Sequence, residues 1–217
     1  MLPQDCLLCG AAGADGLLCP ACAAELPRPP ACGCPVCGEA LPAAGLCGAC
    51  LKAAPAFDAT LAAFRYGFPL DKLVQALKYG HRLAIADFLA TAMLAGPRPA
   101  GELVIPLPLS RQRLRQRGFN QAAEIARPLA RALGLPLVLD GCTRTLDTPP
   151  QATLPWQARH KNVRHAFECA LDLTGKSVIV VDDVMTSGAT LAEFARILKI
   201  HGAARVTNWV AARALRN

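Results

Sequence analysis

The sequence predicts an α/β protein in which a parallel sheet is flanked by helices and preceded by a small cysteine-rich module. Apolar runs of strand length alternate with segments of helical spacing from residue 60 onward, which is typical of a doubly wound sheet. The 217 residues are 53% hydrophobic and 18% charged, a balance that excludes a disordered chain. Nine of the eleven cysteines fall within the first 50 residues, which indicates that they serve one local N-terminal module.

The clustered cysteines form an internal repeat with a period of 28 residues. The repeat is Cys6-x2-Cys9-x9-Cys19-x2-Cys22, followed by Cys34-x2-Cys37-x9-Cys47-x2-Cys50. Paired Cys-x2-Cys turns predict two structural four-thiolate Zn²⁺ sites; disulfides, which need an oxidising compartment, and a redox pair are the alternatives. The spacing leaves open whether sequential or crossed pairs share an ion, and whether Cys32 exchanges with Cys34. We expect a double zinc ribbon over 1–55 and a second domain over 56–217.

The elements of the second domain follow from its hydrophobic spacing. Apolar and β-branched runs predict strands over 60–65, 103–109, 135–139, 177–181 and 205–210. Helical spacing predicts helices over 70–78, 83–94, 119–133 and 189–201; Gly80 ends the first, and Pro128 lies inside the third.

The formal charge of +7 is unevenly distributed. The first 55 residues carry four acids and two bases, whereas the rest carries 21 bases and 12 acids. The second domain is therefore suited to an anionic partner such as nucleic acid, a nucleotide or another phosphate ester. The N-terminus lacks the pattern of a secretory signal, and the weakly charged run 83–96 is too short to span a membrane. We expect a cytoplasmic protein without membrane insertion.

The segment 178–190, VIVVDDVMTSGAT, carries the strongest functional signal. It is a β-branched strand, two acids, and a Thr/Ser/Gly turn that opens a helix. Ligands of α/β sheets bind beyond the carboxyl ends of strands, where Asp182 and Asp183 meet a polar ligand. The helix N-terminus offers N–H groups to an anion, and Gly188 permits close approach. The pattern predicts a sugar-phosphate site, with an ordinary helix-capping turn as the alternative.

The common nucleotide loops are not supported. The run TGKS at 174–177 resembles the end of a Walker A loop, but Ala170 stands where glycine is required, and the run precedes a strand. The four histidines have no spacing that couples them to each other or to a nucleophile.

The segment 178–190 resembles the signature of type I phosphoribosyltransferases, which bind 5-phosphoribosyl-1-pyrophosphate (PRPP). The resemblance implies that Asp182 and Asp183 hold the ribose 2- and 3-hydroxyls, and that Mg²⁺ bridges pyrophosphate and sugar hydroxyls. It assigns the 5-phosphate site to Met185, Thr186, Ser187, Gly188, Ala189 and Thr190.

A cationic segment follows the predicted strand 103–109. Arginine occupies every second position from Arg111 to Arg117, and its guanidinium donates two parallel hydrogen bonds to phosphate. The alternatives are a solvated basic loop and contacts with nucleic-acid phosphates, although Phe119 is the one aromatic residue nearby in sequence.

Almost the whole chain resembles the ComF family of competence-associated phosphoribosyltransferase-like proteins, which includes the GntX group. The motifs are the double zinc ribbon, LKYG at 77–80, PLPLSRQRLRQRGFNQA at 106–122, matches between 151 and 167, and the PRPP-type loop. The resemblance implies a pyrophosphate-binding loop over 110–117, in which Arg113 and Arg117 match best and Ser110 also contacts substrate. It further implies that Lys78 reaches the same phosphates and that 151–162 forms a flap.

The leading hypothesis is a PRPP-binding, Mg²⁺-dependent phosphoribosyltransferase-like protein with two structural zinc ions, linked by its family to competence or DNA utilisation. If the protein is an active transferase, a nitrogen nucleophile displaces pyrophosphate from ribose C1, while Asp182 and Asp183 orient the sugar and Arg113 and Arg117 stabilise the leaving group. A second hypothesis is a non-catalytic module that binds single-stranded DNA. A third is that the zinc ribbons dock a helicase-like or other DNA-uptake protein.

Overall fold

The structure is a computed structural model that describes residues 5–12, 16–146 and 164–215. The predicted flap over 151–162 lies outside this part of the chain. The helices are α1 (Pro20–Ala24), α2 (Gly48–Lys52), α3 (Leu70–Gly80), α4 (Ala84–Leu94), α5 (Arg111–Arg117), α6 (Gln121–Leu133) and α8 (Ala189–Ile200). The strands are β1 (Ala59–Arg65), β2 (Leu103–Pro106), β3 (Cys142–Arg144), β4 (Phe167–Cys169), β5 (Ser177–Met185) and β6 (Arg205–Arg213). No helix within the described ranges has the length and apolar character needed to cross a membrane.

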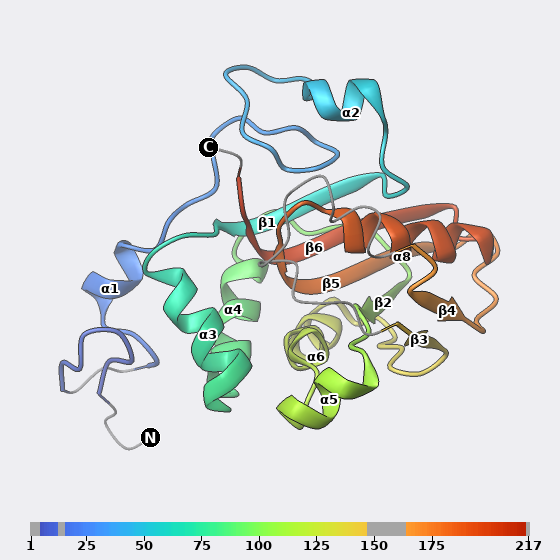
Figure 1. Ribbon diagram of the computed structural model, residues 1–217. Helices are drawn as coiled ribbons and strands as arrows, with labels where there is room; N and C mark the ends of the chain where they lie inside the picture. The colour runs from blue at the N-terminus through green and yellow to red at the C-terminus, as the bar shows by residue number, and fades with distance from the viewer. Residues whose placement is uncertain (1–4, 13–15, 147–163, 216–217) are drawn as a thin grey trace.

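A four-stranded parallel sheet in the order β1-β6-β5-β2 forms the centre of the fold. Figure 1 shows α3, α4 and α6 on one face of this sheet and α8 on the other. Alternate residues of β5 face opposite sides, because side chains of a strand alternate. Ile179 and Val181 pack in the core with α3, α4 and α6, whereas Val178 and Val180 pack in the core with α8. The parallel, helix-flanked sheet predicted from the sequence is confirmed.

Several elements differ from the sequence-based prediction. The strand predicted over 177–181 continues to Met185, and the strand predicted to end at Val210 continues to Arg213. The segment expected to be a loop after β2 contains the helix α5. The short antiparallel pair β3-β4 was not predicted, and the expected strand over 135–139 pairs with β2 through one isolated bridge, between Val104 and Leu137.

The two cysteine repeats lie on opposite sides of β1, as α1 and α2 show in Figure 1. Leu18 and Leu26 of the first repeat region join the core with α3 and α4, whereas Val36 of the second packs against the core with α8. Between the repeats the chain follows β1, whose Arg65 N–H donates to the carbonyl of Pro27 (3.0 Å). The domain boundary expected at residue 55 falls between α2 and β1, yet both repeats contribute side chains to the cores of the sheet.

Candidate functional site

A cavity of about 610 Å³ opens at the carboxyl ends of β2 and β5, next to the end of α3 and to α5. Nine residues singled out in the sequence line it together: Lys78, Arg113, Arg117, Asp182, Asp183, Met185, Thr186, Gly188 and Thr190. Three others, Ser110, Ser187 and Ala189, are not among its lining residues. Elements that are far apart in sequence thus bring cations, carboxylates and a phosphate-type turn to one place.

The two acids lie within β5 and not beyond its end. Asp182 and Asp183 are buried because β5 stays paired with β6 as far as Met185. The backbone N–H of Asp183 donates to Oδ1 of Asp182 (2.9 Å). Oδ2 of Asp183 lies 2.5 Å from Nζ of Lys78, which belongs to α3. Lys78, expected to reach the phosphates of a ligand, is therefore paired with a carboxylate in this structure.

This ion pair makes the two neighbouring carboxyl groups titrate differently. Burial, followed by repulsion from Asp183, raises the pKa of Asp182 well above its usual range. Burial also opposes ionisation of Asp183, but attraction to Lys78 and the hydrogen bond from it prevail and lower the pKa of Asp183. Burial opposes the charge of Lys78, and attraction to Asp183 outweighs it and raises the pKa of Lys78. The pair is ionised at neutral pH, and Asp182 is the carboxyl group that takes a proton more easily.

The turn between β5 and α8 is built around Gly188, whose φ of +79° is a left-handed conformation that glycine adopts without strain. A Cβ at this position would stand 2.6 Å from Cε of Met185 and 3.7 Å from the ring of Phe57. The hydroxyl of Ser187 accepts from the N–H of Ala189 (3.3 Å) and so stabilises the turn. Since the first turn of α8 contains no acid, its N-terminus presents an electropositive end to the cavity.

The helical conformation of α5 divides its four arginines into two faces. Residues four apart lie on the same side of a helix, so Arg113 and Arg117 both line the cavity, whereas Arg111 and Arg115 are exposed. Ser110 is buried at the helix start, and its hydroxyl accepts from the N–H of Arg113 (3.4 Å). In the structure Ser110, for which the resemblance implies a substrate contact, caps the helix that carries the two arginines.

Arg117 is held by two neighbours from motifs that carry the family resemblance, to which the sequence analysis gave no role of their own. Its Nη1 donates to Oε1 of Gln121 (2.9 Å), and its guanidinium carbon lies 5.4 Å from the centre of the Tyr79 ring. Both neighbours line the cavity. Gln121 lies four residues after Arg117, a spacing visible in the sequence, whereas the contact with Tyr79 depends on how α3 and α5 pack.

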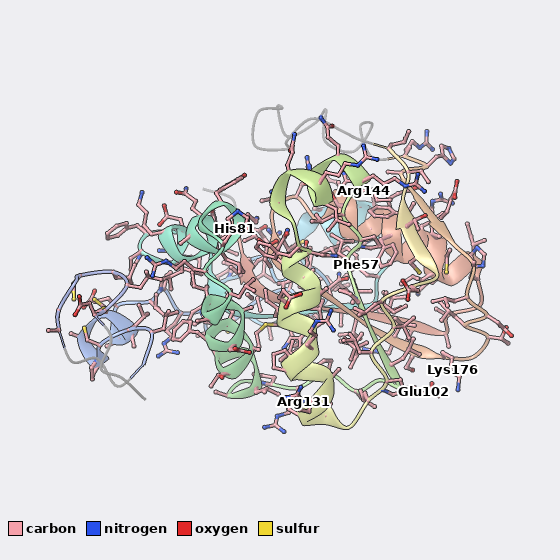
Figure 2. All side chains as sticks on the ribbon, turned by 90° about the horizontal axis from the view of Figure 1, so that it is seen from below. Phe57, His81, Glu102, Arg131, Arg144 and Lys176 are labelled. Atoms are coloured by element: carbon pink, nitrogen blue, oxygen red, sulfur yellow. The ribbon has the colours of Figure 1, made fainter. Side chains whose placement is uncertain are left out.

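Gln116, which lies within the implied pyrophosphate loop, also lines the cavity. Four other lining residues carry no local signal in the sequence: Tyr66, Gln75, His81 and Arg144. Figure 2 labels His81, which follows α3, and Arg144, the last residue of β3. Arg144 is buried, and its guanidinium carbon lies 5.6 Å from the centre of the Phe167 ring. A bridge between Ser110 and Arg144 joins β3 to the start of α5, which explains how a residue of an unpredicted strand reaches the cavity.

The cysteines gather into two groups that can each hold one metal ion. The first group is Cys6, Cys9, Cys19 and Cys22, the second is Cys34, Cys37, Cys47 and Cys50, and the sulfur atoms of each group lie within 4.8 Å of one another. The sequential pairing is therefore the one adopted. Cys34 belongs to the second group and Cys32 to neither. Four thiolates in each group match the tetrahedral preference of Zn²⁺.

Comparison with known protein families covers both parts of this arrangement. The phosphoribosyl transferase domain family matches residues 120–215, and the double zinc ribbon domain family matches residues 1–51. The fold and the site thus define a phosphoribosyltransferase-domain protein with an N-terminal double zinc ribbon.

Individual relatives narrow this class to one family. The DNA utilization protein YhgH of Escherichia coli O157:H7 is 34% identical over 97% of this chain and 90% of its own. Competence protein F of Haemophilus influenzae is 32% identical over 91% of this chain and 90% of its own. Competence protein ComFC of Bacillus subtilis is 35% identical over 47% of this chain and 40% of its own. The chain belongs to the ComF family.

Proposed function

We propose that this protein binds PRPP in the cavity at the carboxyl ends of β2 and β5, and that this binding is part of a role in DNA utilisation. The observation that carries the proposal is the meeting of three features at one cavity. These are the buried acids Asp182 and Asp183, the turn at Gly188 before α8, and the face of α5 that bears Arg113 and Arg117. The relatives' names, a DNA utilization protein and a competence protein, support the biological setting.

Each feature suits one part of PRPP. The turn from Thr186 to Thr190 offers backbone N–H groups and hydroxyls to the 5-phosphate. Asp182 and Asp183 accept hydrogen bonds from the ribose hydroxyls, and for Asp183 this requires Lys78 to share or release the carboxylate. Arg113 and Arg117 of α5 both donate to the pyrophosphate. Together they concentrate positive charge where the ligand is most negative.

The carboxylates and the neighbouring phosphate turn are also a donor set that fits Mg²⁺, which binds through one or two carboxylates together with substrate phosphates. Asp182 and Asp183 would hold the ion, which would supply charge neutralisation for the pyrophosphate. The transfer chemistry that fits the site is displacement at ribose C1. A bond forms from a nitrogen nucleophile, the bond to the pyrophosphate oxygen breaks, and pyrophosphate leaves with the electron pair. The side chains position the sugar and stabilise the leaving group.

Calorimetry with PRPP and Mg²⁺ tests the proposal. The wild-type protein should bind, and the double variant Asp182→Asn/Asp183→Asn should bind at least about 100-fold more weakly, since both hydroxyl acceptors lose their charge. Asp172→Asn is the matched control, because Asp172 is exposed in the loop before β5 and accepts from the N–H of Thr174 (3.0 Å). Circular dichroism verifies folding. Equal PRPP affinity in the double variant and the wild type contradicts the proposal.

A second function, binding of single-stranded DNA, is favoured by the outer face of α5. Arg111 and Arg115 are exposed there and point away from the set of residues that lines the cavity. Arginines on an open surface suit phosphate contacts that do not depend on base sequence. The DNA utilization name of the Escherichia coli relative agrees with such a role.

The two arginine faces allow the two functions to be separated. Arg111→Ala/Arg115→Ala should weaken binding of a labelled single-stranded oligonucleotide and leave PRPP affinity within twofold. Arg113→Ala/Arg117→Ala should weaken PRPP binding by at least tenfold. DNA affinity should fall steeply between about 50 and 200 mM salt, and losing two phosphate contacts should reduce the logarithmic salt slope by about 1.4. DNA binding that the Arg111/Arg115 variant leaves unchanged argues against this second function.

A further inference from the structure

A buried arginine joins the second cysteine group to the phosphate turn. Arg213 is the last residue of β6, and its side chain is 4% exposed. In the sheet it is the register partner of Met185, the last residue of β5, so that it stands beside the point where the turn begins. This residue was not singled out by the sequence, and the site described above does not include it.

On one side the guanidinium of Arg213 contacts the second zinc ribbon. Its Nε donates to the carbonyl of Cys37 (2.8 Å), a cysteine of the second group. Its Nη2 lies 3.2 Å from Oε2 of Glu39. A Cβ on Gly38, which lies between these two residues, would stand 3.6 Å from Cγ of Arg213, so the knuckle rests directly on the aliphatic part of the side chain.

On the other side the same guanidinium contacts the phosphate turn. Its Nη1 donates to the carbonyl of Met185 (3.3 Å) and, more closely, to the carbonyl of Thr186. Nη1 also donates to the carbonyl of Ala214. Met185 and Thr186 both line the cavity. One side chain therefore hydrogen-bonds a zinc knuckle and the backbone of the turn at once.

Because the guanidinium of Arg213 is buried, it depends on acceptors from both segments. A buried guanidinium is tolerated when its N–H donors and its charge are satisfied. For Arg213 the acceptors come from two separate segments, and their carbonyls must stay where the planar group can reach them. The four thiolates could hold a metal ion, which would fix the knuckle that carries the carbonyl of Cys37. The first cysteine group packs instead against the core with α3 and α4, through Cys6 and Cys19.

We propose that zinc in the second ribbon sets the conformation of the phosphate turn through Arg213, which acts as a positioning residue for the 5-phosphate. The proposal rests on PRPP binding as the function of the cavity. It assigns different roles to the two ribbons, because the first has no corresponding place beside the turn. It also predicts that the effect is confined to the phosphate turn and spares the pyrophosphate contacts of Arg113 and Arg117.

The test measures two fragments of PRPP separately on the full chain. Arg213→Met should weaken binding of ribose 5-phosphate by at least tenfold, while inorganic pyrophosphate with Mg²⁺ binds within threefold of wild type. Arg213→Lys should bind ribose 5-phosphate with an affinity between those of the wild type and Arg213→Met. An ammonium keeps the charge near Glu39 but cannot reach both segments. Arg205→Met is the control, since Arg205 is exposed at the opposite end of β6. Metal analysis should show the zinc content of Arg213→Met unchanged.

A second pair of variants tests the zinc link directly. Cys47→Ser in the second group should weaken ribose 5-phosphate binding by at least tenfold, and Cys19→Ser in the first should leave it within threefold. The inference is overturned if Arg213→Met binds ribose 5-phosphate as wild type does, or if it loses both fragments equally. Failure of the wild-type protein to bind PRPP at all instead refutes the proposed function on which the inference rests.

Discussion

Nζ of Lys78 and Oδ2 of Asp183 lie 2.5 Å apart at the cavity, where they join α3 to the end of β5. Without a ligand, the carboxylate proposed to hold a ribose hydroxyl already has a cationic partner. In the proposed complex, binding of a sugar phosphate would exchange one set of contacts for another, and Lys78 would become available to the negative charge of the ligand. The ion pair thus stabilises the free protein, and its lysine would contribute positive charge to the proposed complex.

Lys78→Met should destabilise the protein by about 3 kcal/mol at pH 8, because it leaves a buried carboxylate unpaired. The loss should shrink as the pH falls below about 4, the unfolded pKa of an aspartate, and on through the lowered pKa of Asp183. A carboxyl group whose pKa is lowered by folding contributes stability above its unfolded pKa, and that stability disappears as the pH falls through the folded pKa. Urea unfolding at several pH values measures this. Lys72→Met is the control, because Lys72 lies on the same helix with a 58% exposed side chain 3.9 Å from Asp71, and should cost less than about 0.5 kcal/mol.

Asp182→Asn should stabilise the protein by about 1 kcal/mol at pH 8 while it removes PRPP binding. Burial and repulsion from Asp183 raise the pKa of Asp182, and an acid with a raised folded pKa penalises folding increasingly as the pH rises above its unfolded pKa. The asparagine keeps the Oδ1 acceptor for the N–H of Asp183. Unfolding midpoints at pH 4 and 8 check the result; a stabilisation that is equal at both pH values refutes the charge argument.

Gly188→Ala should weaken PRPP binding by at least tenfold, because the new methyl group would stand 2.6 Å from Cε of Met185 and displace it toward the cavity. Gly134→Ala provides the control. Gly134 also has a left-handed φ, +65°, but ends α6 with nothing within 4 Å of the added Cβ. Both variants should cost about 1 kcal/mol in unfolding free energy. Comparable PRPP affinities in the two variants would show that the turn does not contact the ligand.

Metal analysis of the purified protein should find two zinc ions per chain, one for each cysteine group. Cys9→Ser should reduce the content to one, since a structural site needs all four thiolates. Cys32→Ser should leave it at two, because Cys32 lies outside both groups. A content of one in the Cys32 variant would mean that the pairing in solution differs from that in the structure.

The phosphate turn and the cysteine groups could be predicted because their signals are local. The strand, acids and turn of 178–190 follow one another directly, and the 28-residue period of the cysteines is visible without any fold. The sheet and its flanking helices followed from hydrophobic spacing, which reports how an element packs. The family resemblance singled out Arg113 and Arg117 among the arginines of α5, and their helical conformation gives the reason that these two share the face that lines the cavity.

The features that could not be predicted from the sequence depend on pairing between distant segments of the chain. Asp182 and Asp183 end the apolar run, yet the strand continues through them, because backbone pairing with β6 holds residues as far as Met185. β3 and β4 have three residues each, too few for a periodic pattern. The hydrogen bond from Arg213 to Cys37 spans 176 positions of the chain, and no local sequence pattern near either residue predicts it.

The chain that runs alongside β1 has a consequence for self-association. An outer strand with unpaired backbone groups is a template on which another molecule can add a strand. Here Arg65 and Thr60 of β1 donate to the carbonyls of Pro27 and Pro35, at 3.0 and 3.3 Å. On the opposite margin, the N–H of Val104 in β2 donates to the carbonyl of Pro136 (2.9 Å). Both margins of the sheet are thus covered by segments of the same chain that contain prolines. A proline has no N–H with which to extend the ladder, and so these segments discourage stacking of copies into fibres.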